Sequence, residues 1–198
     1  MSVALACGVA SVCVENLQMD TLDDRVRELV PMWLSSLPTD VLVLVRAAND
    51  ETRAHGAREL LGQCVVRILG LVDVLPVEVA ALGCLEAAIS VRWAAREVAP
   101  DRSEGNLAKL AEEAELVERL LGANYANLKR LVLEGGSALG PSEREPSEAG
   151  DTLEPTLQDS VEAWVSRYER PTLRVDDYTL IQVRRFMAKR LAMAQTRS

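Results

Sequence analysis

Aromatic side chains and histidine are scarce in this chain. Three Trp, three Tyr and one Phe are spread over 198 residues, and Leu, Val and Ala supply most of the apolar content. Leu and Ala favour helices, and alternation of β-branched residues is rare, so the sequence predicts an all-α protein. Any histidine-dependent catalytic site or histidine-rich metal site would have to use His55, the single histidine. We expect His55 to be solvated and the protein to hold no metal or cofactor.

Basic charge is in deficit as well. The formal net charge of −8 argues against nucleic-acid binding by the whole protein, because phosphate binding needs a basic surface. Paired C-x-x-C spacing is absent from the four cysteines, so free thiols in a reducing cytoplasm are expected. Long uncharged apolar runs are missing too: residues 60–93 come closest and are interrupted by charges, so no membrane span is predicted.

Composition divides the chain into four parts. Residues 1–19 are expected to be a poorly ordered leader, and residues 20–134 a helical bundle. Residues 135–155 are rich in Gly, Pro, Ser and Glu, which predicts a flexible acidic linker with little to bury. Residues 156–198 carry two short amphipathic helices.

Apolar spacing places the helices of the bundle. The first is expected over 21–36 and ends at Pro38, and a second follows over 39–48. Two more are expected over 51–71 and 76–98, because Pro76 is tolerated in a first helical turn. The fifth is expected as one long helix from about Ser103 to Gly135, with Glu112, Glu113 and Glu115 on its solvated face.

This fifth helix carries a heptad-patterned apolar seam with one polar member, the type of residue that can fix register in a coiled coil. Two interpretations stay open: the seam packs on the chain's own helices, or it joins two copies of the chain in a homodimer. The residues that would mediate self-association are Leu110, Val117, Leu121, Asn124 and Leu128.

The corner between the third and fourth helices joins an acid and a proline inside an apolar stretch. Asp73-Val74-Leu75-Pro76, followed by Gly83 and Glu86, resembles the pattern of the YkvA-like domain, a bacterial family of unknown function. The resemblance covers about residues 50–95. Three residues depart from the family pattern: Val77 and Ala87 replace acids that a cation site would use, and Ala80 replaces a proline. We therefore expect the corner to be structural, with Asp73 capping the fourth helix; a functional acidic site at Asp73 and Glu86 is the alternative.

The two C-terminal helices carry the main functional hypothesis. Amphipathic helices recognise partners by laying an apolar face into a groove. We therefore predict a non-enzymatic, regulatory adaptor that binds another protein, with no catalytic residues; folding of the first tail helix back onto the bundle is the competing interpretation. A basic C-terminal helix also suits a membrane surface, which is a less favoured alternative, and an unrecognised enzyme is less favoured still. The candidate partner contacts are Leu157, Val161, Trp164, Val165, Tyr168, Arg184, Arg185, Lys189 and Arg190.

Overall fold

A computed structural model describes the backbone of residues 6–74, 77–99, 105–135, 155–171, 173 and 175–195. Side chains are described from residue 22 onward in these ranges, apart from 71–79, 134–135, 155–156 and 193–195. In this part of the chain every regular element is a helix and none is a strand, which confirms the predicted all-α fold. Residues 136–154 of the predicted linker lie outside the described residues.

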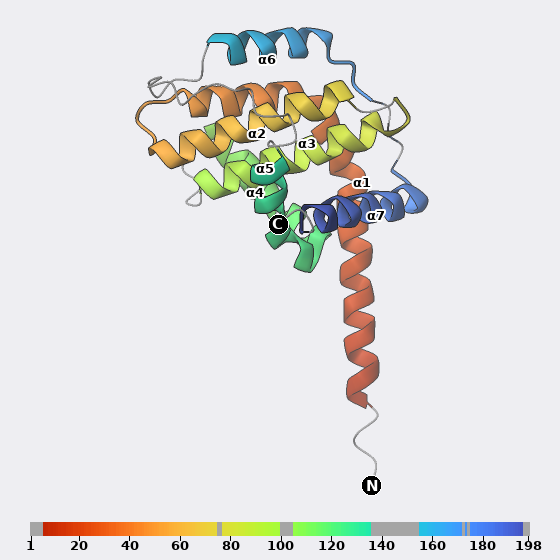
Figure 1. Cartoon of the computed structure of the whole chain (residues 1–198). Helices are drawn as coiled ribbons and strands as arrows, with labels where there is room; N and C mark the ends of the chain where they lie inside the picture. Colours follow the sequence, from red (N-terminus) through yellow and green to blue (C-terminus); the bar gives the residue numbers. More distant parts are fainter. Residues whose placement is uncertain are drawn as a thin grey trace.

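The first element, α1, spans Ala6–Ala48 and contains both Pro31 and Pro38. It begins within the predicted leader and continues through the position where we expected one helix to end and another to begin (Figure 1). The predicted break at Pro38 was therefore wrong. A proline in a helix interior costs about 3 kcal/mol, but a fully buried aliphatic side chain returns about 1.5–3 kcal/mol. Several such side chains are buried on both sides of the proline: Val26, Val30, Leu34, Leu37, Val41 and Leu44.

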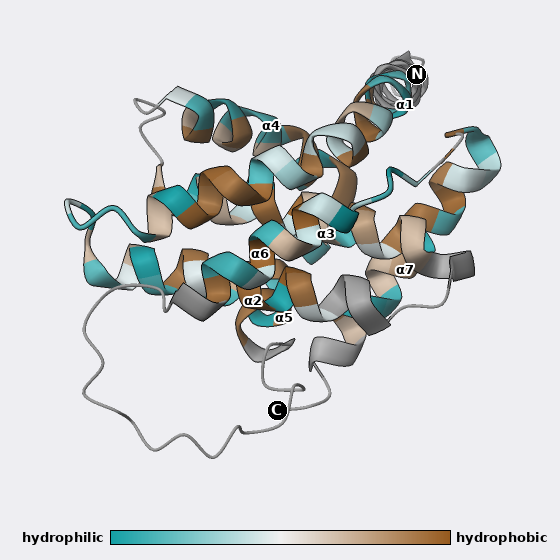
Figure 2. Ribbon diagram, turned by 90° about the horizontal axis from the view of Figure 1, so that it is seen from above, coloured by the Kyte–Doolittle hydropathy of each residue, from teal (hydrophilic) through white to brown (hydrophobic). Residues whose placement is uncertain are grey.

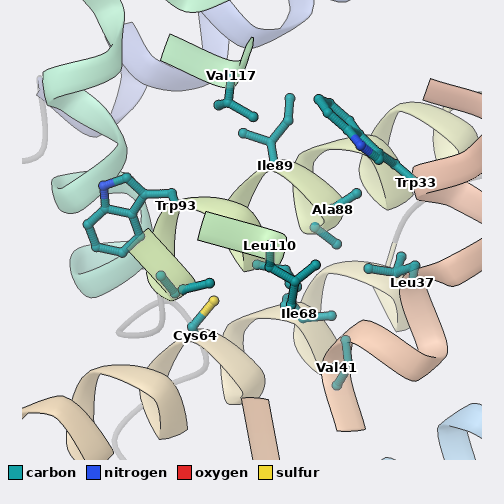
Figure 3. Packing of buried hydrophobic residues seen from close by; sticks show 14 of the residues in the cluster. Trp33, Leu37, Val41, Cys64, Ile68, Ala88, Ile89, Trp93, Leu110 and Val117 are labelled. Carbon is teal, nitrogen blue, oxygen red and sulfur yellow. The ribbon is translucent and has the colours of Figure 1, made fainter. Parts of the chain in front are cut away.

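The central element is α3, Val77–Val98, which contacts α1, α4 (Gly105–Leu121) and α2 (His55–Val74). Its residues 83–95 are buried without interruption, as expected for a helix that neighbours cover on all sides. Figure 3 shows Ala88 and Ile89 of α3 among Trp33 of α1, Ile68 of α2 and Val117 of α4. The hydrophobic core therefore forms around α3.

The predicted long fifth helix is interrupted. After α4 comes a 3-10 segment, η1 (Gly122–Asn127), and then α5 (Leu128–Gly135). Gly122 has a φ of 54°, a left-handed conformation that ends regular α-helix and that glycine adopts at low cost. The prediction of one continuous heptad helix was wrong because apolar spacing continues across a glycine that turns the backbone.

The C-terminal helices are α6, Pro155–Arg167, and α7, Asp177–Gln195, in the region 156–198 where we predicted two helices. α6 lies against α1 and α2, whereas α7 packs against α3, α4, η1 and α5 (Figure 1). α7 alternates between hydrophobic and hydrophilic residues along its length (Figure 2), as an amphipathic helix does. Both helices therefore complete the fold on different sides of the bundle.

One helical stretch in the described part of the chain, Leu22–Ala48 of α1, is long and apolar enough to cross a membrane. Within the most apolar 18 residues of this stretch, 44% is buried inside the protein. The buried side chains of this stretch, among them Trp33 and Leu37, already pack in the hydrophobic core. A core helix of this length and composition meets the same criterion.

Candidate functional site

The contact between α6 and the bundle brings together the five apolar residues that we predicted to bind a partner. Val161 and Trp164 are buried in the core cluster. Leu157, Val165 and Tyr168 are partly buried and pack against it. In this structure the predicted recognition face of α6 therefore rests on the protein's own α1 and α2, which corresponds to the competing interpretation that α6 folds back onto the bundle.

Trp164 supplies the largest side chain of this contact, and its polar atom has no partner among the described residues. Its ring lies 5.3 Å from the ring of Tyr168, centroid to centroid, with the planes tilted by 60°. Such an aromatic pair contributes about 0.5–1.5 kcal/mol beyond its buried area. The indole N–H of Trp164 is buried, and no acceptor in the described part of the chain bonds it. A buried unsatisfied donor costs about 1–3 kcal/mol, so the docked state of α6 is not fully optimised.

Tyr168 compensates for a defect that Pro38 introduces in α1. A regular helix would bond the Leu34 carbonyl to the amide of residue 38, but proline has no amide hydrogen. The Tyr168 hydroxyl donates to that same Leu34 oxygen at 2.6 Å. Burial raises the pKa of Tyr168, and the nearby Cys84 thiol raises it further, so the hydroxyl stays protonated as a donor. The tail of the chain therefore satisfies a carbonyl that the sequence of α1 leaves open.

The apolar face of α7 is occupied by the bundle. Its buried residues are no more than 1% exposed: Leu180, Val183, Met187 and Leu191. Two basic residues predicted as partner contacts instead form ion pairs within the chain, Arg184 with Asp23 of α1 and Arg190 with Glu86 of α3. The other two, Arg185 and Lys189, are exposed. The structure thus separates the predicted basic group into two docking residues and two residues that face solvent.

Glu86 is the centre of the α7 contact. Its side chain is completely buried, and Arg67 of α2 pairs with one of its oxygens. Arg190 of α7 reaches the other oxygen with its Nε at 2.9 Å. Because guanidinium groups hold both oxygens, Glu86 does not offer the open carboxylate that a cation requires. The side chain of Asp73 lies outside the described residues, so its predicted capping role stays a prediction, and no cluster of potential metal ligands occurs in the described region.

The second buried charge of α3 is a cation, Arg92, that lies between two carboxylates, whereas Glu86 is a carboxylate between two guanidinium groups. The Arg92 side chain is 2% exposed and reaches two carboxylates, Asp40 of α1 at 3.3 Å and Glu113 of α4 at 2.7 Å. Its guanidinium also lies 4.4 Å from the ring centroid of Trp33, a cation–π contact. Burial lowers the pKa of Arg92 and raises that of Asp40, which also accepts a hydrogen bond from Ser36 at 2.7 Å. We had expected Glu113 to lie on a fully solvated face, and this prediction was wrong.

The seam residues proposed for self-association have different positions. Leu110, Val117, Leu121 and Leu128 are buried inside one chain. Asn124 falls in η1 and is exposed. This placement favours the first of the two interpretations, in which the seam packs on the chain's own helices, because the four apolar members are already covered.

The remaining candidates for nucleophilic or acid–base chemistry are two buried thiols and one exposed histidine. Cys64 and Cys84 are free and buried. The Cys64 thiol donates to the Ser90 carbonyl at 3.6 Å, and burial raises its pKa to about 12. His55 is exposed at the first residue of α2, as expected. Among the described residues, the Cys64 and Cys84 thiols are thus not brought together with the His55 imidazole.

The sequence reasoning missed the roles of Arg67, Arg92 and Asp40. A signal was present, because Arg67, Glu86 and Arg92 interrupt the most apolar part of the chain. A charge inside an apolar helical stripe is expected to have a buried partner. The sequence did not show which helix would supply that partner.

No family model, curated protein or solved structure matches this chain. The resemblance of residues 50–95 to the YkvA-like domain therefore stays a prediction.

Proposed function

We propose that this chain is a non-enzymatic, regulatory protein-binding module in which α6 is the recognition helix. In the docked state α6 rests on α1 and α2, and on release its apolar face becomes available to another protein. Amphipathic helices bind partners by inserting such a face into a hydrophobic groove. The observation that carries this proposal is the docked but incompletely satisfied state of Trp164, whose buried indole N–H has no acceptor among the described residues.

The size of α6 supports reversible docking. It has 13 residues, and isolated helices shorter than about 12–15 residues are marginal in water. Only Val161 and Trp164 are deeply buried in the contact. Ordering each backbone residue costs about 1–2 kcal/mol, so the apolar gain of this small face is largely offset. A partner that covers the same face and offers an acceptor to Trp164 could therefore compete with the bundle.

The proposal is tested with three variants of the full chain, used as baits in lysate from the native source and compared by quantitative mass spectrometry. Tyr168→Phe weakens the docked state and leaves the apolar face intact, so it should increase the capture of a partner. Trp164→Ala removes the central side chain and should abolish capture. Glu162→Ala changes an exposed residue of the same helix and serves as the matched control.

For the proposal to stand, wild type, Tyr168→Phe and Trp164→Ala must capture different amounts of the partner, and Glu162→Ala must match wild type. Thermal melting of each variant shows whether it remains folded. If wild type, Tyr168→Phe and Trp164→Ala retain the same proteins in the same amounts, α6 is only a part of the core. A protein lost from the Glu162→Ala bait as well would point to the exposed side of the helix and contradict the assigned face.

A further inference from the structure

The inner face of α7 is not available to a ligand, and this changes which part of the helix can meet a surface. The apolar residues Leu180, Val183 and Met187 are at most 1% exposed. A helix that is already docked can act only through its opposite side. Two of the four large hydrophobic residues that are exposed in the described region belong to that side of α7, Tyr178 at 70% and Ile181 at 46%.

Asp177, the first residue of α7, is exposed and lies at the edge of the outer face of the helix. The six other exposed residues of α7 form one continuous stripe. At about 100° per residue they fall within an arc of roughly 100° on the helix surface. The stripe combines an aromatic residue, an aliphatic residue, two cations and two small residues, and it contains no acid. We call it the outer α7 stripe: Tyr178, Ile181, Arg185, Ala188, Lys189 and Ala192.

Two exposed acids, Asp176 and Asp177, lie at the N-terminal end of the stripe, away from its two cations along the helix. Asp176 accepts hydrogen bonds from the backbone N–H and the hydroxyl of Thr179, each at 2.8 Å, and so caps the helix. Asp177 pairs with Arg27 of α1. Arg185 and Lys189 lie about 12 and about 18 Å further along the helix than Asp177. In a protein with a formal net charge of −8, the C-terminal part of the stripe is therefore a local region of positive charge.

We propose that the outer α7 stripe binds the anionic headgroup surface of a membrane. Tyr is favoured at the level of the headgroups, Ile can enter the acyl boundary, and Arg and Lys attract anionic lipids. Electrostatic attraction acts within about 8 Å at physiological ionic strength, so the local charge of the stripe decides the contact and the acidic remainder orients the protein. This inference does not depend on the proposed function of α6.

The dimensions of the stripe favour a lipid surface over a protein partner. From Tyr178 to Ala192 a helix rises about 21 Å, and with a width of about 10 Å the stripe covers roughly 200 Å². A stable protein–protein interface buries about 800 Å² on each side. A bilayer needs no shape complementarity, so a convex stripe of this size can bind it weakly and reversibly.

Co-sedimentation of the full chain with vesicles tests the proposal. Vesicles of phosphatidylcholine alone are compared with vesicles containing roughly 30% phosphatidylserine, at about 0.05 M and about 0.5 M salt. The wild-type chain should be retained by the anionic vesicles at low salt and released at high salt. The double substitution Arg185→Glu/Lys189→Glu should lower the partition coefficient about tenfold or more. Ile181→Ser should lower it as well.

A charge-matched control separates the stripe from the net charge. Lys109→Glu/Arg119→Glu changes two exposed residues of α4 by the same total charge and should leave retention unchanged. Four outcomes overturn the proposal: no retention by anionic vesicles at low salt, equal retention by neutral vesicles, unchanged retention of the α7 variant, or an equal loss in the α4 variant. Arg185-dependent retention on polyglutamate beads without vesicle binding would assign the stripe to an acidic protein instead and would likewise refute the lipid proposal.

Discussion

The hydrogen bond between Tyr168 and the Leu34 carbonyl predicts a specific energetic coupling with Pro38. In the native chain the proline leaves this carbonyl without its intrahelical donor, and the Tyr168 hydroxyl supplies one at 2.6 Å. Replacing Pro38 by Ala restores an amide at the position that a helix normally uses. The hydroxyl of Tyr168 should then lose its importance for stability.

The expected loss of unfolding free energy follows from the groups that each substitution leaves without a hydrogen-bond partner. Tyr168→Phe retains the ring, and with it the contact with Trp164 at 5.3 Å, but removes the hydroxyl that donates to the Leu34 oxygen. A partly buried carbonyl left without a partner should cost about 1–2 kcal/mol. In the Pro38→Ala background the same substitution should cost less than about 0.3 kcal/mol, because the restored amide bonds the carbonyl. The coupling free energy between the two positions is therefore expected to be about 1 kcal/mol or more.

Urea unfolding of the four full-length proteins in this double-mutant cycle measures the coupling. Tyr125→Phe provides a control, because the Tyr125 hydroxyl is buried without a partner among the described residues and its removal should not destabilise the protein. Equal costs of Tyr168→Phe in the native chain and in the Pro38→Ala background would refute the reasoning. Tyr168 would then stabilise the tail in a way unrelated to the proline.

Three other predictions concern buried ionisable groups. Glu86→Gln should lower the free energy of unfolding in urea by about 3 kcal/mol, because it leaves the Arg67 guanidinium, 3% exposed, without a counter-charge; a loss below about 1 kcal/mol would contradict the buried pair. The pKa of Tyr168 in the folded state is raised above its ordinary value of about 10. The contribution of the protonated hydroxyl to the free energy of unfolding is therefore complete below about pH 10 and is lost as the pH rises further. Between about pH 8 and about pH 11, wild type should thus lose more stability than Tyr168→Phe, and parallel curves would disprove this. In a variant whose other two cysteines are serine, Cys64 and Cys84 should resist a thiol reagent until urea unfolds the chain; rapid native modification would show that they are accessible.

A helix of this fold could be predicted from the sequence where the apolar spacing within its own residues defines it. The apolar spacing of Leu180, Val183 and Met187 predicted an amphipathic helix, and those residues are buried. The same spacing did not show what would cover them. The passage of α1 through Pro38 was unpredictable from local rules, because the residue that satisfies Leu34 follows it by 134 positions. The left-handed backbone conformation at Gly122 could not be predicted either, because the apolar repeat continues on both sides of this residue.

The candidate site was predictable only in part, for a related reason. The apolar residues of α6 were identified correctly as a face, since helical spacing defines a face without reference to its partner. Glu86 and Arg92 were visible as charges within an apolar stretch. Their partners come from four different helices, and no spacing rule along one helix connects them. Long-range charge pairing therefore marks the limit of what one sequence shows.

The pairing of the two α3 charges indicates which part of the fold can separate from the bundle at least cost. Removal of α7 would take Arg190, 32% exposed, back to solvent and would leave Glu86 paired with Arg67. Removal of α1 or α4 would instead take one of the two carboxylates from Arg92, which is buried and needs compensation. Local opening follows the lowest free energy, so the C-terminal helices should exchange amide hydrogens before α3 does. Neither charged cluster includes a residue of α6, so α6 could leave the bundle without breaking the charge pairs around α3, as its proposed role requires.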